Sequence, residues 1–69
     1  MNAGDATILD RLAAELTPRQ YEVLVLREVH RLSFPTIGLR LGISWQAAHQ
    51  AHAGALRRAR QINWEGIDA

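Results

Sequence analysis

The chain has 69 residues, a formal net charge of +1 at pH 7 and no cysteine, which excludes a disulfide framework and a thiolate zinc site. A chain of this length buries only about 60% of its extended surface, so we expect one small domain over residues 1–69 with a thin stability margin. No apolar run approaches the roughly 18 residues of a membrane span and no signal peptide is visible, so we expect a cytoplasmic protein without membrane contact.

Two helices are predicted in the first half of the chain. The apolar residues Ile8, Leu9, Leu12 and Leu16 recur at helical spacing. This pattern predicts an amphipathic helix over residues 5–15. A second helix is predicted over residues 18–30, because Thr17 can cap it, Pro18 suits its first position and Gln20 completes a capping box.

A helix-turn-helix pattern follows, centred on Gly42. Ser33 and the proline after Phe34 favour a short helix over residues 34–41, and Gly42 can end it in the left-handed conformation. Gly38 lies four residues earlier, where a crossing helix would have to approach closely. Ser44 can cap a longer helix over residues 45–62. The fold class is therefore predicted to be all-α, with four to five short helices containing a helix-turn-helix and a tail over residues 63–69. The second helix of this motif normally enters the major groove of DNA.

The expected core consists of Leu12, Leu16, Tyr21, Leu24, Val25, Ile37, Leu41, Ile43, Ala48, Ala51 and Leu56. The last helix carries a stripe of small residues, formed by Ala48, Ala51, Ala55 and Ala59. This stripe has two interpretations. It either packs closely against the first helix of the motif or leaves a shallow apolar surface for another chain. Because alanine buries little area, and because Trp45, Ile62, Trp64 and Ile67 are also available, we favour the second interpretation, for example a homodimer.

Basic charge is concentrated on the segment that carries the motif. Residues 16–64 hold seven arginines and two glutamates, whereas residues 1–15 and 65–69 each carry a net charge of −2. All the basic residues are arginine, whose planar fork suits phosphate and guanine contacts. The base composition of a genome can produce the same bias.

The chain from Leu16 to Arg60 resembles region 4 of bacterial sigma factors, which reads the −35 promoter element. The resemblance rests on Leu16-Thr17-Pro18-Arg19-Gln20, on Leu41-Gly42-Ile43-Ser44 and on Ala55-Leu56-Arg57-Arg58-Ala59-Arg60. The LuxR-type response-regulator domain shares the opening and the turn, but this chain lacks the Val and Lys usual early in its reading helix. The resemblance implies double-stranded DNA as a partner, and also RNA polymerase, through its β-flap, or a sigma factor.

The reading helix departs from the family pattern at its start. Where the family has charged residues, this chain has Trp45, Gln46, His49 and Gln50, and only Gln50 keeps the family's residue type. We therefore expect a base preference that differs from an ordinary −35 element. Nothing in the chain matches the parts of a sigma factor that bind the −10 element, so we expect something other than a complete initiation factor.

Eight residues are candidate DNA contacts: Ser44, Trp45, Gln46, His49, Gln50, Arg57, Arg58 and Arg40. Glutamine can pair bidentately with adenine, and histidine can donate to guanine or a phosphate, although the same residues also suit a solvated polar face. Trp45 can stack on a sugar, cover the core or enter a partner. Arg57 and Arg58 can hold phosphates or interact with the helix C-terminal dipole.

The sequence predicts no metal site, no cofactor and no enzyme. His49 and His52 are three apart, a spacing that metal ligands can use, but no third ligand lies near them in sequence. No glycine-rich phosphate loop or pair of carboxylates in an apolar setting is present.

Two functions remain open at this point. The first is a small DNA-binding transcription regulator whose reading helix enters the major groove. A regulator of 69 residues would suit a phage or another mobile element. The second is a protein-interaction module that binds RNA polymerase or a sigma factor and modulates transcription without reading bases.

Overall fold

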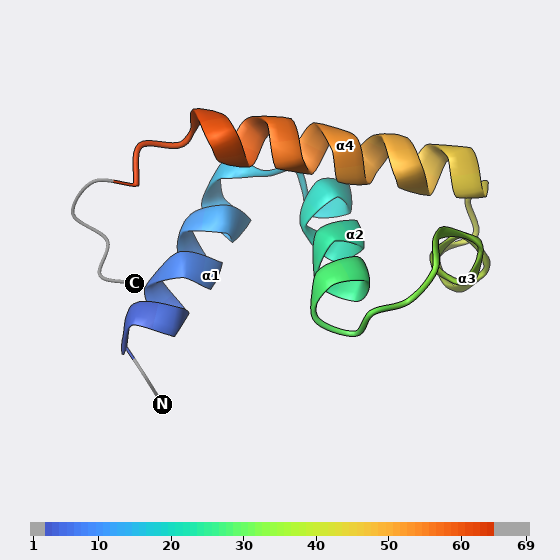
Figure 1. Cartoon of the computed structure of the whole chain (residues 1–69), viewed down its shortest axis with the longest axis horizontal. Helices are drawn as coiled ribbons and strands as arrows, with labels where there is room; N and C mark the ends of the chain where they lie inside the picture. Colours follow the sequence, from blue (N-terminus) through green and yellow to red (C-terminus); the bar gives the residue numbers. More distant parts are fainter. Residues whose placement is uncertain (1–2, 65–69) are drawn as a thin grey trace.

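The computed structural model describes residues 3–64, and these fold into four helices without a strand (Figure 1). Their bounds are α1 Ala3–Glu15, α2 Pro18–Glu28, α3 Phe34–Leu41 and α4 Trp45–Gln61. The long α4 lies across the other three and packs chiefly against α2 and α3. The all-α architecture with a helix-turn-helix, formed by α3 and α4, is confirmed.

The starts of α2, α3 and α4 lie at the predicted residues because each has a local cap. Thr17 and Gln20 form the capping box, with both side-chain-to-backbone hydrogen bonds at 3.1 Å. Ser33 and Ser44 cap α3 and α4 by accepting from backbone N–H groups three residues on. Gly42 has φ 70°, the left-handed conformation expected at the turn.

Three other helix boundaries differ from the prediction. Helix α1 begins at Ala3 rather than residue 5. Helix α2 ends at Glu28 rather than residue 30, because Arg31 takes a left-handed φ of 57° and the Leu32 N–H donates back to Leu26. Helix α4 ends at Gln61 rather than residue 62, since Ile62 leaves the helix in an extended conformation and buries its side chain.

The core has two clusters, one on each side of α2. Buried Leu16, Leu24 and Ala55 form the first, with Leu12, Tyr21 and Leu56 at its edge. Buried Val23, Ile37 and Ala48 form the second, bordered by Leu26, Leu32, Phe34, Leu41, Ile43 and Ala51.

Of the expected core, four residues are buried, namely Leu16, Leu24, Ile37 and Ala48, and the other seven are half-buried, including Val25. The prediction missed three buried hydrophobic residues among those that the structure describes. Val23 was missed because α2 is covered on two sides, so its apolar surface is wider than a single stripe. Ala55 and Ile62 are the others.

The alanine stripe lies inside the fold. Ala48 and Ala55 are fully buried and Ala51 and Ala59 are half-buried. Close helix packing at the turn is also evident at Gly38, where an added Cβ would lie 2.6 Å from the Ile43 carbonyl oxygen.

The expectation that a second chain covers this surface is therefore wrong for the stripe, and also for the buried Ile62. Trp64 is half-buried and its indole N–H donates to the Ala59 carbonyl at 3.0 Å. Ile67 lies outside the described residues.

Candidate nucleic-acid interface

The side of α4 that faces away from the core carries a largely polar surface, interrupted by Ala53, which we call the outward stripe. Its members are Gln46, His49, Gln50, Ala53, Arg57 and Arg60. The helical period places them on one face of α4, opposite Ala48 and Ala55. All are exposed except the half-buried Ala53. From the first to the last member the stripe runs about 21 Å along the helix axis.

The candidates around the turn lie at the start of this stripe. The Ser44 hydroxyl accepts from the Ala47 N–H at 3.0 Å, so its first role is that of a helix cap. The Trp45 side chain is 52% exposed. Arg40 is exposed in the last turn of α3, before Gly42. The structure therefore brings the predicted base-reading residues and Arg40 to the same end of the motif.

Phe34 contacts the exposed His49 from the neighbouring helix. The two rings meet edge to face with centroids 5.0 Å apart, and Phe34 makes a second such contact with His52 at 5.3 Å. The first residue of α3 thus restricts the orientation of a histidine on the outward stripe. Sequence reasoning missed this contact, because nothing in the local pattern around Phe34 points to His49.

Arg58 differs from the other two arginines near the end of α4. Its guanidinium lies 2.6 Å from a carboxylate oxygen of Glu15, which also pairs with Arg11 at 3.2 Å. Arg58 projects about 100° away from Arg57 around the helix, toward α1. Within residues 3–64, Arg57 and Arg60 have no ion pair. The sequence grouped Arg57 and Arg58 together, but only Arg57 lies on the outward stripe.

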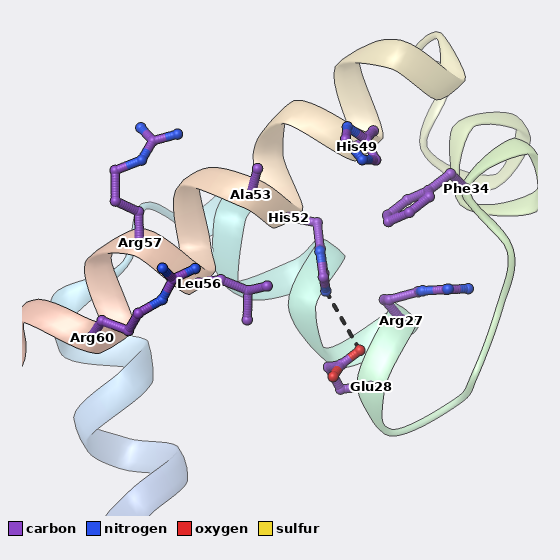
Figure 2. A pocket seen from close by; sticks show the side chains of 9 residues that line it. All are labelled: Arg27, Glu28, Phe34, His49, His52, Ala53, Leu56, Arg57 and Arg60. Carbon is purple, nitrogen blue, oxygen red and sulfur yellow. Dashed lines mark ion pairs between the residues drawn. The ribbon is translucent and has the colours of Figure 1, made fainter.

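A hollow lies between α4 and the end of α2, beside the outward stripe; we call it the flank hollow (Figure 2). It is lined by Arg27, Glu28, Phe34, His49, His52, Ala53, Leu56, Arg57 and Arg60. The His52 imidazole nitrogen Nε2 lies 3.4 Å from the Glu28 carboxylate. No group of three metal-ligating side chains lies together in the described part of the chain.

A second, apolar hollow lies between α1 and α2, and we call it the α1–α2 groove. Its lining is Leu9, Leu12, Tyr21, Leu24, Val25, Glu28 and Val29. Leu9 and Val29 are exposed, Val29 to 63%. Among the described residues, no helix combines the length and apolar character needed to cross a bilayer.

Comparison with known proteins agrees with this architecture. The chain matches the family described as sigma-70, region 4, over residues 12–61, which includes all of α2, α3 and α4. No curated protein and no solved structure matches the chain. The family match covers more than two thirds of the sequence and contains the helix-turn-helix with its outward stripe. The chain therefore belongs to the sigma-70 region 4 family of helix-turn-helix domains.

Proposed function

We propose that this chain is a DNA-binding transcription regulator whose α4 lies in the major groove. The observation that carries the proposal is the outward stripe, a polar face without a single acidic residue on a helix that the motif presents to solvent. A major groove admits one α-helix, and the helix after a Gly-centred turn is the one that enters it in this motif.

Base reading falls to the first turns of α4. Gln46 and Gln50 can each present an amide to adenine, and His49 lies between them on the same face. Trp45, one position earlier, can contact a sugar or a thymine methyl. The Ser44 hydroxyl occupies the Ala47 N–H, and the other N–H groups at the start of α4 can favour a backbone phosphate.

Phosphate contacts fall to the arginines. Arg57 and Arg60 continue the stripe toward the C-terminal end of α4, and Arg40 extends from α3. Arg58 contributes only after it leaves Glu15. A single module of this kind occupies roughly 600–1,000 Å² of protein surface, so a second copy or a recruited protein would be needed for high affinity.

A titration of the purified chain on random and promoter-derived duplexes, at two salt concentrations, tests the proposal. We expect salt-sensitive binding and enrichment of a discrete site. A palindromic site would indicate two copies of the chain, and an asymmetric one a single copy or a different partner. The absence of binding at low salt would reject DNA reading.

The alternative, an interaction module that binds RNA polymerase or a sigma factor, is favoured by one observation. The α1–α2 groove is lined by six apolar side chains and one Glu, and its residues Leu9 and Val29 are exposed. A double variant, Arg57→Ala with Arg60→Ala, separates the two functions. If its effect on transcription survives while DNA affinity is lost, the interaction module is the correct function; a Val29→Ser variant should then abolish that effect.

A further inference from the structure

The α1–α2 groove is an apolar surface that the proposed DNA contacts leave unused. Six of its seven lining residues are apolar, and two of them, Leu9 and Val29, are 44% and 63% exposed. Its volume is about 190 Å³. Pockets for small molecules measure roughly 300–1,000 Å³. The groove therefore suits the side chains of another protein better than it suits a metabolite.

The segment that ends α2 carries opposite charges on either side of Val29. Glu28, whose side chain is 56% exposed, lines the groove, and Glu28 and Arg31 together line a polar hollow beside it. Within residues 3–64, Arg31 has no ion pair. An isologous interface joins the same patch of two copies, so that residue i contacts residue j and residue j contacts residue i. An acid, an apolar residue and a base in a row can pair with their own copy in this way.

The backbone at Arg31 adopts a conformation that is rare for a residue with a Cβ. Its φ of 57° lies in the left-handed region, which favours glycine. Hydrogen bonds on both sides of the next peptide unit fix this loop. The Leu32 N–H donates to the Leu26 carbonyl at 3.1 Å, and Arg27 Nη1 donates to the Leu32 carbonyl at 3.0 Å. Strained backbone of this kind is concentrated at functional sites. The fold thus retains an exposed arginine, at a conformational cost, next to the groove.

We propose that the α1–α2 groove is a self-association surface whose occupant is a second copy of this chain, related by a two-fold axis. Val29 of each copy enters the groove of the other, and Glu28 of each copy pairs with Arg31 of the other. Two-fold dimers are closed, and they are the commonest oligomers.

This dimer lies on a different surface from the alanine stripe and from the outward stripe. Every residue that lines the groove lies on α1, on α2 or directly after α2, so the second copy leaves α4 of both chains accessible. The inference goes beyond the proposed function and supplies the second module that one such domain would need for high affinity on DNA.

The first test measures the dissociation constant of the dimer by sedimentation equilibrium of the full chain without DNA. Val29→Ser is compared with Leu39→Ser, which changes an aliphatic residue that is 87% exposed on α3, outside the groove. Neither core cluster includes Val29, so its substitution should leave the fold intact. Since the two-fold axis places Val29 at two contacts, Val29→Ser should weaken the dimer at least about ten-fold, and Leu39→Ser less than about two-fold. Equal effects would overturn the inference.

The second test uses charge reversal to distinguish a two-fold dimer from any other association. Glu28→Arg and Arg31→Glu each place like charges opposite one another, so each variant alone should dimerise more weakly than the unmodified chain. An equimolar mixture of the two variants restores both ion pairs and should form the heterodimer. The controls, Glu22→Arg and Arg19→Glu, make the same charge changes at exposed positions earlier on α2 and should leave the dimer unchanged. A mixture that associates no better than its two components would overturn the two-fold arrangement.

The dimer and the proposed function fail separately. A chain that stays monomeric at millimolar concentration but binds DNA in a salt-sensitive way would reject the dimer alone and leave the groove to a different protein, such as RNA polymerase or a sigma factor. A chain that dimerises through the groove without binding DNA at low salt would support the dimer and reject DNA reading.

Discussion

The inward and outward faces of the helix-turn-helix are built from different chemistry. Inward, Ile37, Gly38, Ala48 and Ala55 are buried and carry no polar side-chain atom. Outward, the stripe on α4 is polar and basic, and even the aliphatic Leu39 on α3 is 87% exposed. The small inward residues Gly38, Ala48 and Ala55 let the helices approach closely. The long polar side chains of α4 lie on the outward stripe, where they can contact a ligand.

This difference teaches that stability and the proposed DNA recognition are carried by separate residues. Neither core cluster includes a member of the outward stripe. Outward substitutions should therefore change DNA binding while leaving the free energy of unfolding within about 0.5 kcal/mol of its original value. Inward substitutions should destabilise the whole chain, because so small a domain has little stability to lose.

The largest effect is expected from Ile37→Ala, compared with Leu39→Ala on the same helix. Ile37 is fully buried, so its truncation should cost about 3 kcal/mol of the free energy of unfolding. Leu39→Ala should change that free energy by less than about 0.5 kcal/mol. Urea unfolding followed by circular dichroism measures both. Similar losses of the free energy of unfolding for the two variants would contradict the buried position of Ile37 and the exposed position of Leu39 on α3.

The next largest effect is expected from Gln50→Ala, a substitution on the outward stripe. If Gln50 reads an adenine, its loss should reduce discrimination at one base pair by about 2 kcal/mol and leave other positions unchanged. Binding to duplexes that carry each of the four base pairs at that position measures the effect. Gln61→Ala, at the exposed end of α4, is the matched control. A uniform loss across all sequences would place Gln50 on the backbone instead.

The joint variant Arg57→Gln with Arg60→Gln should weaken binding without changing base preference. Two lost phosphate contacts reduce the log–log salt slope by about 1.8, which corresponds to ~12-fold between 50 and 200 mM salt. Stability should stay unchanged, since neither arginine has an ion pair within residues 3–64. An unchanged salt slope, measured by titration, would remove both arginines from the interface.

The sequence was sufficient for features that depend on neighbouring residues. The capping box at Thr17, the caps at Ser33 and Ser44 and the left-handed Gly42 are short-range geometry, so their residue types alone predict them. The expected helix-turn-helix followed from the same signals, and the outward position of Gln46 followed from the helical period.

The sequence was insufficient wherever a contact depends on how helices cross. Glu15 and Arg58 are 43 positions apart, and their pairing requires the end of α1 to meet the end of α4. The contacts of Phe34 with Arg27 and His49 likewise join three helices. The direction of the alanine stripe could not be settled either, because alanine suits both a close helix crossing and an interface.

The smallest effect is expected from Glu15→Gln, which tests whether the two sides of α4 differ because Arg58 is paired. Removing the carboxylate frees Arg58 from a contact of 2.6 Å, and it also frees Arg11 on α1 from a contact of 3.2 Å. An ion pair this exposed contributes about 0–1 kcal/mol to stability, so the fold should tolerate its loss. The freed guanidinium can then reach a DNA phosphate, which would steepen the salt slope by about 0.9 and raise affinity at low salt by ~3-fold.

Asp10→Asn is the control, because it removes one negative charge from an exposed position on the same helix. Equal gains for Asp10→Asn and Glu15→Gln would mean that net charge alone sets affinity. A gain specific to Glu15→Gln that disappears in the double variant with Arg58→Gln would show that this carboxylate restrains one arginine. A single ion pair between α1 and α4 would then limit the affinity of the chain for DNA.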